Sequence, residues 1–344
     1  MTSRIAHLRE RLEEPLLVTN LVNIRYLCGF DSSNAALLVE PGRARLYTDF
    51  RYIGSAREIE GVEAVETRRA LIAHLAEMLS GRIGFETVLP YAQYQALAHG
   101  GIELVPRSGL VEQLRAVKDE SELELIRRIA KVTDRVFEKL LDVDFIGRRE
   151  LDVAWDLAGL FHDAGAEGLA YELIVGSGPT GSHPHGRAGE RVIEAGDLVV
   201  VDAGCSIGGY SSDYTRTFAA GPVGAEQKEA YATVLSAQET ALEAMRAGVP
   251  AIEVDAAARR IIDDSPFKGM FGHGLGHGLG LEVHEAPRMS PESDDILAVG
   301  NVITVEPGVY VEGRFGVRIE DDVVVTADGI ENLTGFRKDL LEVG

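Results

Sequence analysis

Two short apolar segments of this chain each lead into a carboxylate and, after a glycine-containing turn, return to a second carboxylate. In the first case residues 198–201 are apolar and lead into Asp202, and the chain comes back through Asp213. If the chain folds back between Ile207 and Gly208, these two aspartates face each other with Cβ atoms about 5 Å apart. The pattern therefore predicts a β-hairpin that carries an opposed acidic pair.

The second hairpin pattern lies closer to the end of the sequence. An apolar run ends at Glu306, a turn is centred on Gly313, and the returning run contains Glu320. This turn places Glu306 opposite Glu320, although a β-bulge would shift either register by one residue. Two opposed acidic pairs in one chain are improbable as an accident, so the two hairpins predict a shared acidic site.

Like charges that face each other in apolar strands are unfavourable, and burial of an unpaired carboxylate costs still more. Each pair could share a proton, as in acid proteases, but two such pairs in one chain would be exceptional. Both pairs could instead lie in water, although the apolar run before Asp202 argues against this. The third arrangement, binding of divalent cations, turns the repulsion into ligation and is favoured.

A glycine-rich segment, residues 272–287, carries three histidines. Glycine at every second position disfavours a helix, so His273 and His277 do not form the i, i+4 pair of a zincin. His284 is followed by Glu285, but Arg288 stands where a second zincin ligand would be. Glycines permit close approach of the backbone to a ligand, which favours a binding site over a loop with incidental histidines.

Two more histidines, His183 and His185, flank Pro184. Together with the glycine-rich segment, these positions contain five of the nine histidines in the chain. Such a concentration supports a functional site that draws on both segments.

The composition limits the classes of function. The chain has 344 residues, enough for two domains, and a net charge of −21, which disfavours binding to nucleic acid. No apolar stretch approaches the roughly 20 residues of a membrane span, and the first residues lack a signal-peptide core. We therefore expect a soluble cytoplasmic protein. Cys28 and Cys205 lie far apart in apolar surroundings, which predicts buried thiols and no disulfide.

The chain divides into a small α/β part and a larger part. Strand-like runs and a helical segment over residues 69–79 occupy roughly the first hundred residues, and the boundary is expected between Pro106 and Asp119. Asp119 and Glu122 resemble a capping box that begins a long helix. Further helices are predicted over residues 149–166, 225–247 and 251–264. We assign the domains as 1–112 and 113–344.

Six motifs resemble the pita-bread metallopeptidases, the family that includes methionine aminopeptidase, aminopeptidase P and prolidase. They are Val201-Asp202-Ala-Gly, Ser212-Asp213-Tyr-Thr-Arg-Thr, Gly276-His277-Gly-Leu-Gly, Val283-His284-Glu-Ala-Pro, Thr304-Val-Glu306-Pro-Gly and Arg318-Ile-Glu320-Asp. Their order and spacing agree with the family. The first part resembles the creatinase-type domain, which methionine aminopeptidases usually lack. The resemblance thus implies an α/β creatinase-like domain followed by a curved, mainly antiparallel sheet with flanking helices and pseudo-twofold halves.

The resemblance also implies a set of metal ligands and catalytic residues. The ligands would be Asp202, Asp213, His277, Glu306 and Glu320, with Asp213 and Glu320 bridging two divalent cations. Mn²⁺ suits this oxygen-rich set, with Co²⁺, Zn²⁺ and Fe²⁺ as alternatives. The catalytic residues would be Glu306 for proton transfer, His284 for the oxyanion, His273 and His185 beside proline, and Arg318 to orient carboxylates. His183 departs from the family pattern, in which an apolar residue is usual, and could substitute for His185.

Hydrolysis of short proline-containing peptides follows from this resemblance. The favoured function is that of a Xaa-Pro aminopeptidase, because the short first domain and the segment Tyr47-Thr-Asp-Phe-Arg-Tyr resemble short forms of aminopeptidase P. The alternative is a Xaa-Pro dipeptidase, which a basic group for the product-side carboxylate would distinguish. A non-catalytic, peptide-binding family member and a creatinase are disfavoured because all five ligands remain. The family also implies a homodimer.

Overall fold

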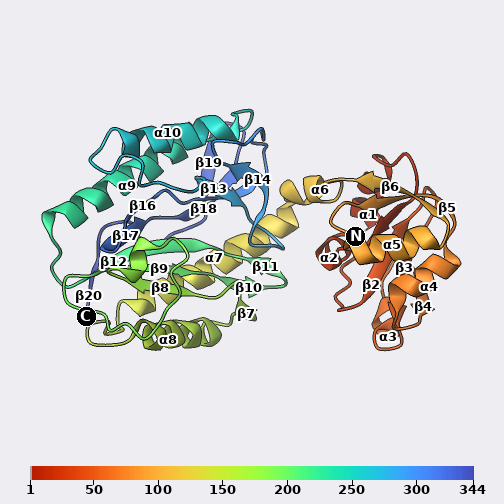
Figure 1. The fold of residues 1–344 in the computed structure, drawn as a ribbon, viewed down its shortest axis with the longest axis horizontal. Coiled ribbons are helices and arrows are strands. Elements are labelled where there is room, and N and C mark those ends of the chain that lie inside the picture. The colour runs from red at the N-terminus through yellow and green to blue at the C-terminus, as the bar shows by residue number, and fades with distance from the viewer. Residues whose placement is uncertain (1) are drawn as a thin grey trace. The chain divides into compact units, whose positions relative to one another are not determined.

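The computed structural model describes residues 2–344, and the chain forms two compact units (Figure 1). The first unit extends to Arg115 and the second begins at Ala116. Within residues 2–344, no helix combines the length and the apolar character that a membrane span requires.

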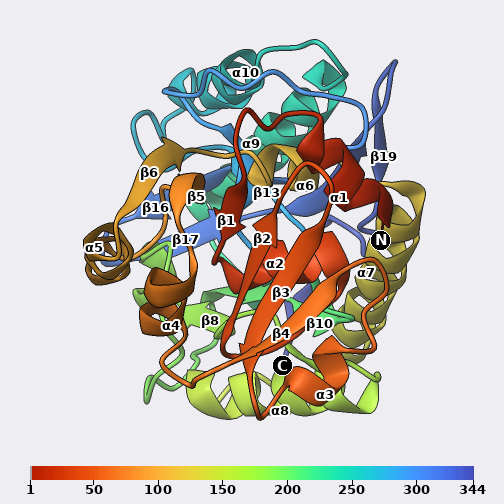
Figure 2. The same ribbon diagram turned by 90° about the vertical axis from the view of Figure 1, so that its right-hand side faces the viewer.

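The first unit contains one mixed sheet of six strands in the order β4-β3-β2-β1-β5-β6, which Figure 2 shows from edge to edge. Its strands are β1 (Leu16–Val18), β2 (Ala35–Val39), β3 (Ala44–Asp49), β4 (Glu63–Thr67), β5 (Gly81–Glu86) and β6 (Ile102–Arg107). Its helices are α1 (Thr2–Arg9), α2 (Leu21–Cys28), α3 (Ile53–Ala56), α4 (Leu71–Met78), α5 (Tyr91–His99) and α6 (Glu112–Ala116). Every residue of β2 is buried, as expected for an apolar strand covered on both faces. Cys28 is buried and has a free thiol, as predicted.

Four long helices and a 3₁₀ turn belong to the second unit. They are α7 (Glu120–Leu140), α8 (Glu150–Asp163), α9 (Ala225–Ala244), α10 (Ala251–Asp263) and the turn η1 (Thr180–Ser182). The predicted capping box is present: Asp119 Oδ1 accepts from Glu122 N at 3.0 Å, and Glu122 Oε2 accepts from Asp119 N at 2.8 Å. Both bonds satisfy backbone donors at the start of α7, which explains why the helix begins there.

The second unit is built on mainly antiparallel sheets. The two larger sheets have the orders β20-β12-β9-β8 and β14-β13-β15-β18-β19, and two smaller ones join β11-β10-β7 and β16-β17. The strands are β7 (Gly168–Leu169), β8 (Ile174–Ser177), β9 (Leu198–Ala203), β10 (Cys205–Ile207), β11 (Tyr210–Ser211), β12 (Tyr214–Ala220), β13 (Gly276–Gly278), β14 (Glu285–Met289), β15 (Val302–Val305), β16 (Gly308–Val311), β17 (Phe315–Arg318), β18 (Asp321–Val325), β19 (Ile330–Asn332) and β20 (Glu342–Val343).

Alternation of side chains along the strands creates a separate core on each face of these sheets. Val199 packs with the apolar residues of α7 and α8, whereas Leu198 packs with those of α9 and α10. Figure 1 accordingly shows the strands between α9 and α10 on one side and α8 on the other. The sheets are thus covered on both faces, and the ends of their strands are left to form a site.

The register of the first hairpin differs from the predicted one. Asp202 pairs with Thr215, not with Asp213. The turn consists of Gly208 and Gly209, which have φ angles of 59° and 84°, and Ile207 pairs with Tyr210. The chain therefore reverses one residue later than predicted, because two consecutive left-handed residues suit a tight hairpin turn. Asp213 lies in the break between β11 and β12.

The second hairpin has the predicted register. Gly308 pairs with Arg318 in the β16–β17 ladder, and Val305 pairs with Asp321 in the β15–β18 ladder. Glu306 and Glu320 occupy the junction between these two ladders and stand opposite each other. Gly313 has a φ of 68° at the turn, as a glycine-centred reversal requires.

Candidate metal and peptide site

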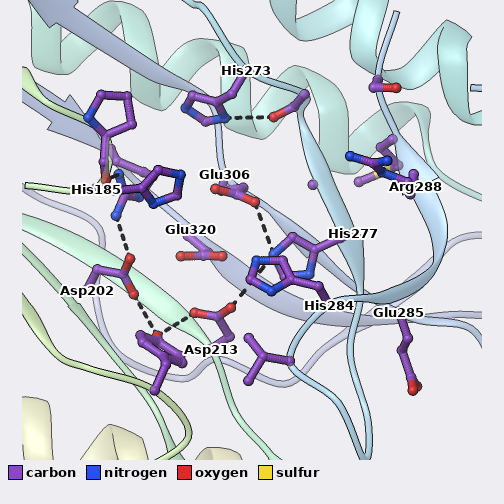
Figure 3. A pocket seen from close by; sticks show the side chains of 18 of the residues that line it. His185, Asp202, Asp213, His273, His277, His284, Glu285, Arg288, Glu306 and Glu320 are labelled. Atoms are coloured by element: carbon purple, nitrogen blue, oxygen red, sulfur yellow. Dashed lines mark hydrogen bonds and ion pairs between the residues drawn. The ribbon is translucent and has the colours of Figure 1, made fainter. Parts of the chain in front are cut away.

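The five side chains that the sequence suggested as metal ligands lie in one cavity of the second unit, about 910 Å³ in volume (Figure 3). They come from five places in the sheets: Asp202 from β9, Asp213 between β11 and β12, His277 from β13, Glu306 directly after β15 and Glu320 directly before β18. The topology therefore brings the first of these residues, Asp202, together with the last, Glu320, which lies more than a hundred positions later in the sequence.

Three of these residues form a group that is compact enough to hold a cation. Asp213, His277 and Glu320 each offer one ligand atom, and these atoms lie within 4.8 Å of one another. His277 Nε2 also lies 3.4 Å from Glu306 Oε1 and 3.8 Å from Asp213 Oδ2. Burial lowers the pKa of His277 to about 4, so near neutral pH the imidazole is uncharged and has a lone pair for a metal.

The carboxylates of this group repel one another. Burial raises the pKa of Asp213, and the charge of Asp202 raises it further. Burial likewise raises the pKa of Glu306 and of Glu320, and for Glu320 the neighbouring Asp213 adds to the effect. A set of carboxylate oxygens with one neutral imidazole suits divalent cations such as Mn²⁺, and bound cations would offset this repulsion.

Two threonines hold the glutamates of the site in place. Thr215 Oγ1 donates to Glu320 Oε2 at 2.7 Å, and Glu320 N donates to Thr215 O at 3.1 Å. Thr304 Oγ1 lies 3.4 Å from Glu306 Oε1 and accepts from His277 N at 3.1 Å. These bonds link neighbouring strands directly behind the candidate ligands.

Tyr171 is a functional candidate that the sequence did not reveal. Its hydroxyl lies 2.6 Å from Asp202 Oδ1 and also contacts Asp213 Oδ1. Burial and the two carboxylates raise the pKa of Tyr171 well above 10, so it remains a neutral donor. One hydroxyl therefore joins Asp202 to Asp213, although the two aspartates are not opposite each other in the ladder.

Arg318 connects the acidic group to the histidine side of the cavity. Its Nη2 donates to Asp202 Oδ2 at 2.6 Å, and its Nη1 donates to Pro184 O at 3.0 Å and Tyr310 Oη at 2.9 Å. Tyr310 Oη lies 3.0 Å from His273 Nε2. Tyr310 is a second residue that sequence reasoning missed.

The remaining predicted histidines differ in their placement. His185, His273 and His284 line the cavity, and the rings of His277 and His284 have centroids 4.2 Å apart. Burial lowers the pKa of His273 to about 4 and also lowers the pKa of His284. His183 is exposed and does not line the cavity, whereas His185 does. His183 is therefore a weaker candidate for a catalytic role than His185.

Comparison with known proteins identifies the family. Residues 124–327 match metallopeptidase family M24, and residues 4–117 match the Creatinase/Prolidase N-terminal domain. The chain belongs to metallopeptidase family M24. This match, with the structural neighbours below, confirms the predicted fold of a creatinase-type domain followed by a pita-bread domain. As a member of this family, the chain is a metallopeptidase.

Three related proteins align with nearly the whole length of this chain. It is 34% identical to the Xaa-Pro dipeptidase of Pyrococcus furiosus over 95% of this chain and 94% of that protein. The structure of a Xaa-Pro dipeptidase from Bacillus anthracis has 37% identity and a TM-score of 0.96, and covers 99% of each chain. The structure of an X-Pro aminopeptidase from Thermotoga maritima has 34% identity and a TM-score of 0.88, over 97% of this chain and 99% of that one.

Proposed function

We propose that this protein is a Xaa-Pro dipeptidase that uses two divalent cations and that these cations are Mn²⁺. The aminopeptidase expected from the sequence is the second candidate, supported by the likeness to the Thermotoga maritima enzyme. The dipeptidase is supported by the names of the Pyrococcus furiosus and Bacillus anthracis relatives and by one feature of the cavity, the position of Arg288.

Arg288 would supply the basic group that binds the product-side carboxylate of a dipeptide, a group that the sequence alone did not reveal. Its side chain lines the cavity, and in Figure 3 the guanidinium lies across the site from His185. The backbone N–H of Arg288 donates to Asp295 Oδ2 at 2.8 Å, which fixes the residue on β14. A guanidinium is well suited to bind the carboxylate of a dipeptide, which a longer peptide does not have at this position.

The candidate ligands would hold the cations; they are Asp202, Asp213, His277, Glu306 and Glu320. When bound, the cations would supply Lewis-acid activation of water and of the peptide carbonyl. The donor chemistry of the cavity fits this role, since four acidic side chains match the charge of two divalent ions.

The residues of the chain would carry the remaining steps. Water attacks the carbonyl carbon before proline, Glu306 accepts the proton of the water, and the same carboxyl returns it to the proline nitrogen as the C–N bond breaks. His284 donates a hydrogen bond to the oxyanion that develops on the carbonyl oxygen. Arg318 holds Asp202, while His273 and His185 bound the proline ring.

The decisive experiment is a comparison of peptides after chelation and addition of Mn²⁺. Xaa-Pro should be hydrolysed with a higher kcat/KM than the matched Xaa-Pro-Yaa and Xaa-Pro amide, because only the dipeptide presents its carboxylate to Arg288. Faster hydrolysis of the tripeptide would favour the aminopeptidase, and no hydrolysis of any of the three would contradict both. We also propose that the protein is a cytoplasmic homodimer. Light scattering at micromolar concentration tests whether it is a dimer.

A further inference from the structure

A buried ion pair joins Glu285, one of the residues that line the cavity, to Lys118, and the proposed mechanism has no role for either residue. Lys118 Nζ lies 2.7 Å from Glu285 Oε1. The side chains of Lys118 and Glu285 are only 1% and 5% exposed, respectively. The desolvation penalty of burying two charges offsets much of the free energy of their attraction. A buried ion pair is therefore weak evidence that the two residues serve stability.

The backbone that carries the lysine is anchored on both sides. Lys118 N donates to Gly300 O at 2.9 Å, and Asn301 Nδ2 donates to Ala116 O at 2.8 Å. The capping box of α7 begins at the next residue, Asp119. The ammonium group therefore projects from a fixed point of the second unit.

The carboxylate of Glu285 occupies space that is free because residue 280 is a glycine. A Cβ atom added at Gly280 would lie 2.2 Å from Glu285 Oε1 and 3.2 Å from Lys118 Cε. No side chain larger than hydrogen fits there unless the ion pair moves. Gly280 is itself held, because Ser211 N donates to Gly280 O at 3.0 Å.

Glu285 is the residue next to His284, and the two point in different directions. In Figure 3 His284 lies beside His277 over the acidic group, whereas Glu285 points away from it. Glu285 begins β14 and pairs with Gly278, where the β13–β14 register shifts. The carboxylate that Lys118 holds therefore belongs to a residue at an irregular point of this ladder, one position after His284.

We propose that Lys118 and Glu285 are positioning residues that set the orientation of the His284 imidazole. The ion pair holds the first residue of β14, and His284 directly precedes that residue on the wall of the cavity. His284 lines the cavity, is exposed, and has its ring centroid 4.2 Å from that of His277. A shift of the backbone at Glu285 would therefore turn the imidazole away from this position. This inference rests on the proposed function, in which His284 stabilises the oxyanion.

The test uses three changes that displace the carboxylate or remove the pair in different ways. Glu285→Gln removes the charge, Gly280→Ala displaces the carboxylate sterically, and Lys118→Met with Glu285→Gln leaves no buried charge unpaired. Each change is made in the wild-type and His284→Ala backgrounds. For each protein, kcat and KM for a Xaa-Pro dipeptide, metal content and Tm are measured.

In the wild-type background we expect kcat to fall by about tenfold or more, with metal content and KM nearly unchanged. In the His284→Ala background the same changes should cause no further fall in kcat, because the group that they orient is already absent. The double variant guards against misfolding, since it should recover Tm without recovering kcat. Leu140→Ala, in the buried core at the end of α7, is the stability control and should lower Tm but not kcat.

The outcomes separate the two proposals. An equal fall in kcat in both backgrounds, or an unchanged kcat in all three variants, would overturn the positioning role alone. An unchanged kcat in His284→Ala itself would overturn the oxyanion role in the proposed function, and the positioning role with it. Recovery of both Tm and kcat in the double variant would assign the ion pair a purely structural role.

Discussion

Arg318 donates from Nη2 to Asp202 Oδ2 at 2.6 Å, and the two side chains are 4% and 13% exposed. The same guanidinium donates from Nε to Thr215 Oγ1 at 2.9 Å. Thr215 in turn donates to Glu320, so Arg318 fixes one carboxylate directly and another through a hydroxyl. The planar fork of arginine makes this arrangement, whereas an ammonium group offers only a point charge.

Replacement of Arg318 by lysine should therefore lower kcat/KM even though the charge remains. Loss of one charge-assisted hydrogen bond, worth about 1.5–3 kcal/mol, predicts a decrease on the order of 10- to 100-fold. Steady-state kinetics with a Xaa-Pro dipeptide measure it. Arg127→Lys is the matched control, because Arg127 pairs with Glu331 on the outside of the second unit. Equal activity of both variants would show that the positive charge alone suffices.

The acidic group predicts an unusual effect of pH on stability. Burial raises the pKa of Glu320 above its ordinary value of 4.5, so the folded protein binds this proton more tightly than the unfolded chain. The free energy of unfolding contributed by Glu320 is therefore fully present below pH 4.5 and decreases as the pH rises toward the raised pKa. In metal-free protein, Glu320→Gln should abolish this decrease in the free energy of unfolding with rising pH.

We expect chelated Glu320→Gln to melt several degrees above chelated wild-type protein at pH 8, and the difference to shrink at pH 5. A change of about 1 kcal/mol shifts Tm by roughly 2–4 °C in a unit of this size. Calorimetry of both proteins over this pH range measures the effect. A difference in Tm that is constant with pH would mean that repulsion of the Glu320 carboxylate does not limit stability.

Asp213→Ala and Glu320→Ala should each abolish turnover and reduce bound metal toward one ion or none. Both residues belong to the compact group of candidate ligands, so the loss of either removes a carboxylate from it. Elemental analysis after dialysis against Mn²⁺ gives the metal content. Asp156→Ala, which removes an exposed carboxylate of α8, should retain both metal and activity. Near-normal peptidase activity in either of the first two variants would end the two-metal proposal.

The second acidic hairpin was predictable because its register depends on local chemistry. Gly313 allows a reversal with positive φ, and apolar residues continue on both sides of it. Glu306 and Glu320 therefore face each other as the sequence indicated. The start of α7 was predictable for the same reason, since Asp119 and Glu122 satisfy each other within one turn.

The first hairpin shows why a close reading of the pattern can still miss the register. Gly208 and Gly209 share the turn, and the sequence does not reveal which pair of residues occupies its centre. A shift of the turn by one residue brings Thr215 opposite Asp202. The break before β12 still directs Asp213 into the cavity, where Tyr171 joins the two aspartates. The choice of ligands therefore does not depend on the predicted pairing.

Tyr171, Tyr310 and Arg288 were missed because the sequence around them does not mark them as parts of a site. Tyr171 reaches Asp202 and Asp213 only after β8 and β9 pair, and Tyr310 meets His273 only through the packing of distant strands. A tyrosine or arginine in such a segment has no spacing that distinguishes it from an ordinary surface residue. Tertiary structure was needed to find them.

Arg288→Met tests whether the cavity recognises the carboxylate of a dipeptide. Loss of a charge-assisted contact worth about 1.5–3 kcal/mol predicts a rise in KM for Xaa-Pro on the order of 10- to 100-fold, with kcat little changed. The matched Xaa-Pro amide is the control substrate, and its KM should hardly change because it lacks the carboxylate. Equal effects of Arg288→Met on the acid and the amide would remove the main structural support for the dipeptidase.

His284→Ala distinguishes three roles of this histidine in one variant. The ring of His284 lies beside that of His277 on the cavity wall, so it can reach a substrate without being a ligand. As an oxyanion donor, its loss should reduce kcat by about 10² or more while both metals and KM are retained. If His284 were a ligand, metal would be lost together with activity, and if it were structural, Tm would fall while kcat per folded molecule held. An intact kcat with two metals bound would refute the oxyanion role.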